Sequence, residues 1–388
     1  SKFSEEITAR PTKLFAEAVS ERKKMGENIL SFGLGEPDFE TPKYIVDATF
    51  KAIQSGYTHY SDAQGLLELR KLIAKAATKQ YGVEFDSKEV AVTPGIKSAA
   101  YSAMAAILQP GDKVGLCTPC YVAYPAMIKV AEPQAEIIPI DLHKDYSFDM
   151  ERLETVIKSG IKILIVNSPN NPTGSIFTRE EVEKIIDLCL KHSVYILSDE
   201  VYDRIVFSGN KHISFAEYDK IKNHLILANG YSKSHAMTGW RLGYVLAPED
   251  ICYKIGRLQF NTNTNVATFV QKGACSIYEH EWDHILNYTN ELEERMVYFH
   301  NCINKINNLS GIFPKGGFFY MVNIEKTGMN SNEFCAKLVL ETGIATTPGI
   351  AFGENWDHYV RFSLAVPQEQ IKLGIELLEE FMIKLGEK

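Results

Sequence analysis

The sequence predicts an α/β fold, with a mostly parallel, doubly wound sheet in a large domain and a smaller α+β domain formed by both ends of the chain. Between residues 89 and 247, short β-rich runs alternate with segments of helical periodicity, as in parallel strands joined by crossover helices. Some runs are continuously apolar, as at residues 163–166 (Ile-Leu-Ile-Val), which is typical of strands covered on both faces. After about residue 278, a long charged helical segment leads into strand-rich sequence.

The large domain contains the strands of the main sheet and the helices that cover them. We expect a helix at residues 98–108, and residues 179–191 also show helical periodicity. In an open parallel sheet, ligands bind beyond the carboxyl ends of the strands, so the polar residues that follow the strands are the candidates for a site. The expected strands are residues 89–93, 113–117, 136–140, 161–167, 195–199, 224–229 and 243–247.

The small domain combines distant parts of the chain. The N-terminal residues have no place in the large sheet, so we assign them to this domain. We place the large domain at residues 45–285 and the small domain at residues 1–44 plus 286–388. The expected elements of the C-terminal part are a helix at residues 279–305, strands within residues 313–324 and 344–364, and a closing helix at residues 368–384.

The composition argues against several classes of protein. Apolar residues make up 45% and charged residues 23%, which is ordinary for a chain that buries a large core. The net charge of −8 disfavours a dedicated surface for nucleic acid or an anionic membrane. The longest apolar stretches are about half of the roughly 20 residues that a membrane span needs. No signal-peptide pattern opens the sequence, so we expect a cytoplasmic protein.

Metal, redox and dinucleotide motifs are weak or incomplete. The seven cysteines are scattered, as expected for reduced thiols. Cys117 and Cys120 form a Cys-x-x-Cys, but no second ligand pair lies nearby, so we interpret them as ordinary thiols and expect no metal site. Gly33 and Gly35 form a Gly-x-Gly, but Asp38 stands where the third glycine would be. The fingerprint of a nicotinamide enzyme is therefore missing.

The polar residues that follow the strands share one chemistry. Lys233 ends a Gly-Tyr-Ser-Lys turn after one strand and is placed to form an imine. Asp199 ends another strand, where a buried carboxylate keeps a neighbouring ring nitrogen protonated. Tyr121 follows a third strand and is available to stack on such a ring. These three residues indicate an aromatic cofactor that carries a carbonyl group.

An anion site is predicted beside them. The loop Gly95-Ile96-Lys97 opens onto a helix, whose free backbone N–H groups favour an anion. Ser232 and Arg241 supply a hydroxyl donor and a fixed positive charge to the same anion. The combination predicts a phosphorylated aromatic cofactor.

Each of these features has a simpler interpretation by itself. A lysine after a strand is usually a solvated surface residue, and Asp-Glu at a strand end is often only a helix cap. Asn-Pro-Thr-Gly at residues 171–174 is commonly just a turn. Tyr121 alone fits packing, and Arg241 alone fits a surface ion pair. The functional interpretation depends on their joint occurrence, in this order, at the ends of successive strands.

The ordered motifs resemble those of the class I/II aminotransferases, which are fold-type-I pyridoxal-phosphate enzymes, and in particular the aspartate/aromatic aminotransferase-like subgroup. The resemblance covers nearly the whole chain. Any one motif is weak, but the ordered set is highly specific. The motifs are residues 35–39 (Gly-Glu-Pro-Asp-Phe), 60–70, 167–174, 198–202 (Ser-Asp-Glu-Val-Tyr), 232–243 and 360–363 (Val-Arg-Phe-Ser).

This resemblance implies pyridoxal 5′-phosphate as the cofactor, held as a Schiff base on Lys233. Lys233 would also move the proton to and from the substrate Cα. Asp199 would pair with the ring nitrogen, and Tyr202 and Asn171 would hydrogen-bond the ring oxygen. The phosphate and the ring would be held by Gly95, Ile96, Lys97, Tyr121, Ser232 and Arg241.

The resemblance also implies how the substrate binds. Arg361 of the small domain is similar to the arginine that binds the substrate α-carboxylate through two parallel bonds, assisted by Gly35 and Asn171. Tyr60 is similar to the tyrosine that reaches the cofactor phosphate of the partner subunit, which implies a homodimer with shared active sites. The implied activity moves an amino group from an L-amino acid (aspartate, aromatic or broad range) to a 2-oxo acid such as 2-oxoglutarate.

The sequence leaves some alternatives open. Tyr121 stands where aspartate-specific members carry Trp, the phosphate loop reads Gly-Ile-Lys, and no residue stands out that would bind a second carboxylate. The amino donor is therefore not fixed. Elimination, decarboxylation or cyclisation of an amino acid would use the same Lys233, Asp199 and Arg361. A ligand-sensing regulator of this type would carry an additional basic DNA-binding domain, which the net charge of −8 does not favour.

Overall fold

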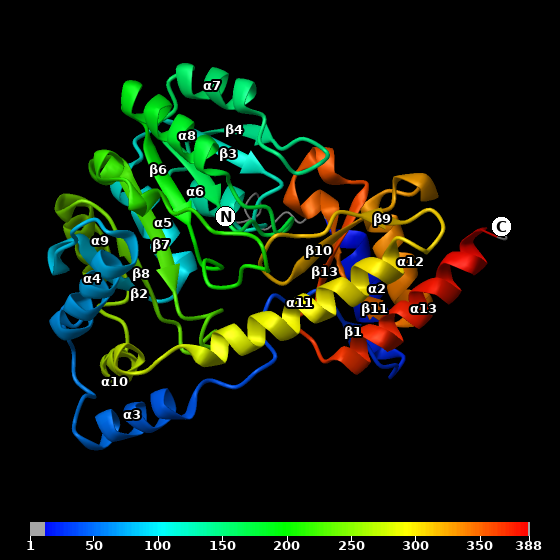
Figure 1. The fold of residues 1–388 in the computed structure, drawn as a ribbon, viewed down its shortest axis with the longest axis horizontal. Coiled ribbons are helices and arrows are strands. Elements are labelled where there is room, and N and C mark those ends of the chain that lie inside the picture. The colour runs from blue at the N-terminus through cyan, green and yellow to red at the C-terminus, as the bar shows by residue number, and fades with distance from the viewer. Residues whose placement is uncertain (1–11, 387–388) are drawn as a thin grey trace.

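A computed structural model describes residues 12–386 and contains the predicted large sheet (Figure 1). Its strands follow the order β2-β8-β7-β6-β5-β3-β4. The neighbours from β4 to β7 run parallel, whereas β8 runs antiparallel to both β7 and β2. The α/β fold with a mostly parallel sheet is confirmed. The strands are β2 (Val90–Thr93), β3 (Lys113–Thr118), β4 (Glu136–Asp141), β5 (Ile163–Asn167), β6 (Tyr195–Asp199), β7 (Leu225–Gly230) and β8 (Gly243–Leu246).

Helices cover both faces of this sheet. Leu164 and Val166 of β5 pack in one core cluster with α7 and α8, whereas Ile163 and Ile165 pack in the opposite cluster with α5, α6 and α9. Burial on both faces explains why the run is continuously apolar. The helices around this sheet are α3 (Lys43–Gln54), α4 (Leu67–Tyr81), α5 (Ile96–Ile107), α6 (Tyr124–Ala131), α7 (Met150–Lys158), α8 (Arg179–Lys191), α9 (Glu249–Thr262) and α10 (Thr268–Ala274).

A second, smaller sheet lies in the C-terminal part of the chain, with the antiparallel order β12-β13-β10-β9. The N-terminal strand β1 pairs in parallel with β11, and Ala18 of α2 packs against Ala336 and Val339 of α12. The domain boundaries stay a prediction. The elements are α2 (Lys13–Lys24), β1 (Leu30–Ser31), β9 (Ser310–Gly311), β10 (Phe319–Asn323), α12 (Ser331–Thr342), β11 (Ile344–Ala345), β12 (Thr347–Pro348), β13 (Tyr359–Ser363) and α13 (Gln368–Gly386).

The C-terminal part departs from the sequence-based expectation in two places. The patterns do not predict α12, although Asn330 and Glu333 form a capping box at its start. The strand expected within residues 313–324 is shorter, because Pro314, Gly316 and Gly317 precede it and Phe319 is the first residue that pairs with β13.

The long helix α11 (Asp283–Ile303) joins the two parts of the molecule. Figure 1 shows it running from beneath the large sheet to the smaller sheet. Near the middle of α11, Arg295 forms an ion pair with Asp38 at 2.9 Å. This contact holds the N-terminal segment that passes from the smaller sheet to α3.

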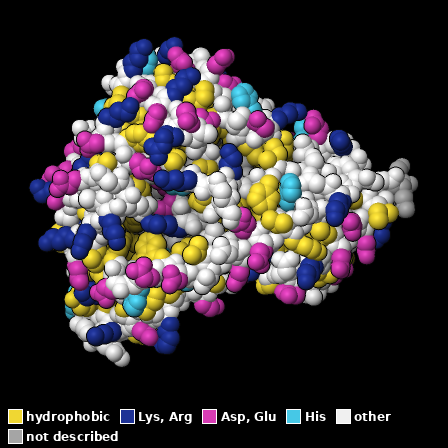
Figure 2. All heavy atoms as spheres, viewed as in Figure 1, with side chains coloured by type: hydrophobic (Ala, Val, Ile, Leu, Met, Phe, Trp, Pro, Cys, Tyr) yellow, Lys and Arg dark blue, Asp and Glu magenta, His cyan; other side chains and the backbone are white. Residues whose placement is uncertain are grey.

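The surface and the cysteines add no further site. Figure 2 shows acidic and basic side chains interspersed over the visible face. Within residues 12–386, no helix combines the length and apolar character that a membrane span requires. In the same described part, no group of His, Cys, Asp and Glu residues could hold a metal ion. Cys117 and Cys120 are free, buried thiols, and burial raises the pKa of each to about 12.

Candidate active site

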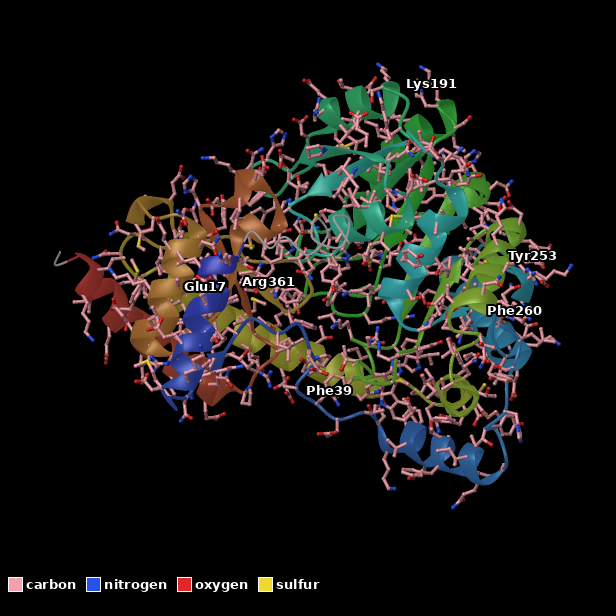
Figure 3. All side chains as sticks on the ribbon, turned by 180° about the vertical axis from the view of Figure 1, so that it is seen from behind. Glu17, Phe39, Lys191, Tyr253, Phe260 and Arg361 are labelled. Atoms are coloured by element: carbon pink, nitrogen blue, oxygen red, sulfur yellow. The ribbon has the colours of Figure 1, made fainter. Side chains whose placement is uncertain are left out.

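Most of the predicted site residues line one cavity of about 560 Å³, which lies where the strand ends of the large sheet face the smaller sheet. Figure 3 labels Arg361 at this junction. β5 and β6 end at Asn167 and Asp199, so their polar ends meet here. The predicted residues that line the cavity are Gly35, Ile96, Lys97, Tyr121, Asn171, Asp199, Tyr202, Ser232, Lys233, Arg241 and Arg361.

Two predicted residues do not line the cavity. Gly95 (φ 81°) precedes α5 and lies against Arg241. Its positive φ favours glycine, and a Cβ atom at this position would lie 2.5 Å from the Arg241 guanidinium, which would then have to shift. Tyr60 lies in the connection between α3 and α4 with 86% of its surface exposed. Within one chain, Tyr60 does not reach the site.

The Lys233 side chain is partly buried and is held at the edge of the cavity. Its Nζ donates a hydrogen bond to the Gly35 carbonyl oxygen at 2.5 Å. Burial lowers the pKa of Lys233 to about 8, against the opposing influence of the Glu36 carboxylate. A lower pKa increases the fraction of neutral amine at physiological pH, and the neutral amine is the nucleophilic form.

The Asp199 carboxylate is held by two donors. The Tyr124 hydroxyl donates to Oδ2, and the Val201 N–H donates to Oδ1 at 3.2 Å. Burial raises the pKa of Asp199 to about 6, while the hydrogen bond from Tyr124 acts in the opposite direction. Burial also raises the pKa of Tyr124, whose hydroxyl therefore stays protonated and serves as a constant donor.

The residues of the predicted anion site lie together at the start of α5. This helix begins at Ile96 rather than at residue 98, because the turn at Gly95 ends the preceding loop earlier than expected. Ile96 and Lys97 therefore lie in the first helical turn, where backbone N–H groups lack intrahelical partners. Arg241 donates to the Thr238 carbonyl oxygen at 2.7 Å. Among residues 12–386, no carboxylate is within ion-pair distance of Arg241, so its charge is available to a ligand.

The Arg361 guanidinium is buried without a counter-ion. It is 6% exposed and donates to Asn171 Oδ1 at 3.0 Å, to the Gly33 carbonyl oxygen at 2.7 Å and to Thr347 Oγ1 at 3.1 Å. Its Nε has no partner, and no described carboxylate forms an ion pair with it. Burial lowers the pKa of Arg361 to about 10. Because an uncompensated buried charge is costly, the site fits an anionic ligand.

Aromatic residues shape the walls of the cavity. Tyr121 packs edge-on against Tyr124, with ring centroids 5.7 Å apart. Tyr202 contacts Phe318 and Phe319 edge-on, and burial raises its pKa well above the ordinary value. The Tyr202 hydroxyl therefore remains a hydrogen-bond donor throughout the physiological range.

Several functional candidates were missed by sequence reasoning. Tyr124 follows Tyr121 by one helical turn but belongs to no motif, and its contact with Asp199 spans 75 residues. The sequence patterns assign only the backbone amide of Lys97 to the site, yet the Lys97 Nζ lies 5.7 Å from the Tyr121 ring centroid in the cavity. The other lining residues that the patterns did not single out include Leu34, Glu36, Val122, Thr238, Phe319 and Thr347.

Comparisons with known proteins agree with this geometry. The family model described as "Aminotransferase class I and II" matches residues 27–378. The chain is 34% identical to aromatic-amino-acid aminotransferase 2 of Thermococcus litoralis, over 92% of each chain. It is 32% identical to an aspartate aminotransferase of Geobacillus stearothermophilus, over 97% of each chain.

Solved structures show the same similarity in three dimensions. An aromatic aminotransferase from Pyrococcus horikoshii superposes with a TM-score of 0.89 at 33% identity, covering 94% of this chain and 99% of that one. An aspartate aminotransferase from Thermus thermophilus with maleate superposes with a TM-score of 0.91 at 27% identity, covering 98% of each chain.

Proposed function

This chain belongs to the class I and II aminotransferases and is an enzyme that transfers amino groups, and we propose that it does so with pyridoxal 5′-phosphate held in the cavity around Lys233. One observation carries the proposal. A partly buried lysine of lowered pKa, a buried carboxylate and a buried guanidinium without a counter-ion converge on one cavity. Such perturbed groups cluster at functional sites.

The residues of the cavity fit this cofactor. The first turn of α5, Ser232 and Arg241 offer amides, a hydroxyl and a positive charge for the phosphate. Tyr121 offers a flat aromatic surface, and Asp199 offers a carboxylate for the ring nitrogen. When bound, the cofactor supplies a carbonyl carbon and a ring that withdraws electrons from the substrate Cα. Lys233 supplies the amine that matches the carbonyl group.

The side chains of the protein perform the remaining steps. Arg361 binds the α-carboxylate through its fork of N–H groups, which leaves the amino group and the Cα–H bond directed at Lys233. The Lys233 Nζ removes the proton from Cα and returns a proton during transfer. Tyr202 and Asn171 would hold the ring oxygen of the bound cofactor. Transamination is preferred to elimination or cyclisation because the relatives compared above are aminotransferases.

The cavity supports a broad choice of substrates. Leu34 and Val122 line it with apolar side chains that are 64% and 42% exposed, which suits an aromatic side chain. Lys97 also lines it, and no described carboxylate forms an ion pair with its ammonium group. This cation is suited to the second carboxylate of aspartate or of 2-oxoglutarate. We propose that aromatic donors contact the apolar wall and that dicarboxylic substrates contact Lys97.

Replacing Lys97 with methionine tests this division. We expect kcat/KM for aspartate and 2-oxoglutarate to fall by about 10- to 100-fold, because one charged hydrogen bond contributes about 1.5–3 kcal/mol, while kcat/KM for phenylalanine changes by less than about threefold. Leu34→Ala is the matched variant. For it we expect kcat/KM for phenylalanine to fall, while kcat/KM for aspartate and 2-oxoglutarate changes little. Equal losses for both classes of donor in Lys97→Met would refute the division and would instead indicate damage to the phosphate site.

Replacing Tyr124 with phenylalanine tests the role of Asp199. The Tyr124 hydrogen bond keeps the pKa of Asp199 lower than burial alone would set it, so its loss favours the protonated carboxyl group. We expect the acid limb of the pH profile of kcat to move to higher pH by about one unit, since 1.36 kcal/mol corresponds to one unit. Tyr320→Phe is the control, because this buried tyrosine bonds His300 outside the cavity. An unchanged acid limb would contradict the assignment.

The homodimer is also a proposal. Exposed apolar side chains on α3 and α9, together with Tyr60, support it, and Figure 3 labels Tyr253 and Phe260 at the outer edge of the large part. In a dimer, Tyr60 would reach the cofactor phosphate of the other subunit. Sedimentation or light scattering gives the mass of the assembly. A monomer that is fully active would exclude the shared site.

A further inference from the structure

The connection between β12 and β13 crosses from the smaller sheet to the large part of the molecule. It consists of residues 349–358, which we call the crossing loop. Trp356 in this loop is only 3% exposed and belongs to the core cluster of the large part. Its ring centroid lies 5.9 Å from that of Tyr146. The Cys120 N–H, next to Tyr121, donates to the Phe352 carbonyl oxygen at 3.0 Å.

One carboxylate, that of Asp141 at the end of β4, connects this loop to the large sheet. Its Oδ1 accepts a hydrogen bond from Thr118 Oγ1 at 2.6 Å and another from Trp356 Nε1 at 3.3 Å. Its Oδ2 accepts from Asn355 Nδ2 at 2.7 Å. Two donors therefore come from the crossing loop and one from β3.

A carboxylate suits this contact, because its two oxygen atoms offer several acceptor positions and can join three donors that approach from different elements. No Lys or Arg among residues 12–386 forms an ion pair with Asp141, so these three donors are its side-chain partners. Removing it would leave the Thr118 hydroxyl, the Trp356 indole N–H and the Asn355 amide to seek other partners.

The crossing loop also contacts the arginine of the cavity. The Phe352 ring is buried, and its centroid lies 5.0 Å from the Arg361 guanidinium carbon. Phe319 lies on β10, which pairs with the strand of Arg361, and its ring centroid lies 4.2 Å from the same carbon. The two rings limit the positions open to the guanidinium, because both contact its delocalised face.

We propose that Asp141 is a positioning residue for the binding of the substrate carboxylate. It holds the crossing loop against β3 and β4, the loop fixes Phe352, and Phe352 together with Phe319 fixes the Arg361 fork. This inference depends on the proposed role of Arg361. The backbone beside Tyr121 has its own contact with the loop, the Cys120–Phe352 hydrogen bond, which does not involve Asp141.

The test uses the full-length holoenzyme with Asp141→Ala and Asp141→Asn. We expect KM for both phenylalanine and aspartate to rise about tenfold in Asp141→Ala, with kcat within about twofold of wild type, because small displacements of a binding group weaken substrate binding. Asp141→Asn retains acceptor capacity and should show a smaller increase. Absorbance of the bound cofactor should be unchanged. The fluorescence of Trp356 should change in Asp141→Ala, since its indole N–H loses its acceptor.

Four further variants make the result decisive. Asn355→Ala removes one loop donor and should raise KM in the same direction, and the double variant should show less than the sum of the single effects. Asp112→Asn, at the opposite end of the β3–β4 pair, is the control and should leave KM unchanged.

An unchanged KM in folded Asp141→Ala, or an equal loss of kcat and cofactor, would overturn the proposal. If Arg361→Lys left KM unchanged, the proposed role of Arg361 would fail instead. Should Asp141→Ala not fold, Asp141→Asn and Asn355→Ala carry the test.

Discussion

Amino transfer should fall by at least about 10⁴-fold when Lys233 is replaced with alanine, because the variant loses both the amine that holds the cofactor and the base that moves the Cα proton. The structure supports this size of effect, since Lys233 is the amine whose burial lowers its pKa to about 8 at the edge of the cavity. Turnover is the first measurement. Intact mass after borohydride reduction is the second, and it should show covalent cofactor in the wild type alone.

The fold should survive this substitution. Burial disfavours the charged form of Lys233 in the folded state, so the folded protein carries an electrostatic cost below about pH 8. Between about pH 8 and the ordinary lysine pKa of 10.5, Lys233 loses its proton in the folded protein but keeps it in the unfolded chain. The free energy of unfolding therefore rises over this range, and the cost is relieved. Alanine removes the cost at all pH values. We therefore expect the cofactor-free variant to be no less stable than the cofactor-free wild type at pH 7.

The matched control is Lys222→Ala. Lys222 is a partly buried lysine that forms an ion pair with Glu89 at 3.0 Å and lies outside the cavity. It should retain full activity and the covalent cofactor. Wild-type turnover in Lys233→Ala would refute the assignment, and loss of folding in that variant alone would show that Lys233 stabilises the structure.

The sequence could predict that Asp199 and Lys233 lie near each other, because both positions follow from a rule about strand ends. Asp199 and Lys233 come after neighbouring parallel strands, so the topology of the sheet brings them together whatever the sequence between them. Arg361 comes from another sheet, 128 residues after Lys233 in the chain. Only the family resemblance indicated its role, because no local pattern distinguishes it from any other arginine in a strand.

The missed features depend on contacts that no local pattern encodes. Tyr124 reaches Asp199 only because α6 packs against the sheet with this residue in its first turn. The position of the Lys97 side chain depends on α5 beginning at Ile96 rather than at residue 98. The contact between Asp141 and Trp356 joins residues that are 215 positions apart. The helix α12 is different, since its start at the capping box of Asn330 and Glu333 is encoded by a local sequence pattern.

Replacing Arg361 with alanine should reduce kcat/KM for every amino acid by about 10²- to 10³-fold. Removing one member of a buried, hydrogen-bonded charge pair costs about 2–5 kcal/mol, and each substrate shares the α-carboxylate that Arg361 is proposed to bind. The buried guanidinium, with its Nε unpartnered and no described counter-ion, indicates that its pair is completed by the ligand. The loss should appear mainly in KM, and bound cofactor should be retained.

Two comparisons separate this role from simpler ones. Arg361→Lys keeps the charge but lacks the planar fork, so we expect it to recover only part of the loss. Arg70→Ala removes another buried arginine, which bonds the Gly65 carbonyl oxygen outside the cavity, and it reports the cost of losing a buried guanidinium without a substrate role. If only aspartate and glutamate suffered in Arg361→Ala, Arg361 would bind a side-chain carboxylate, and Lys97 would become the candidate for the α-carboxylate.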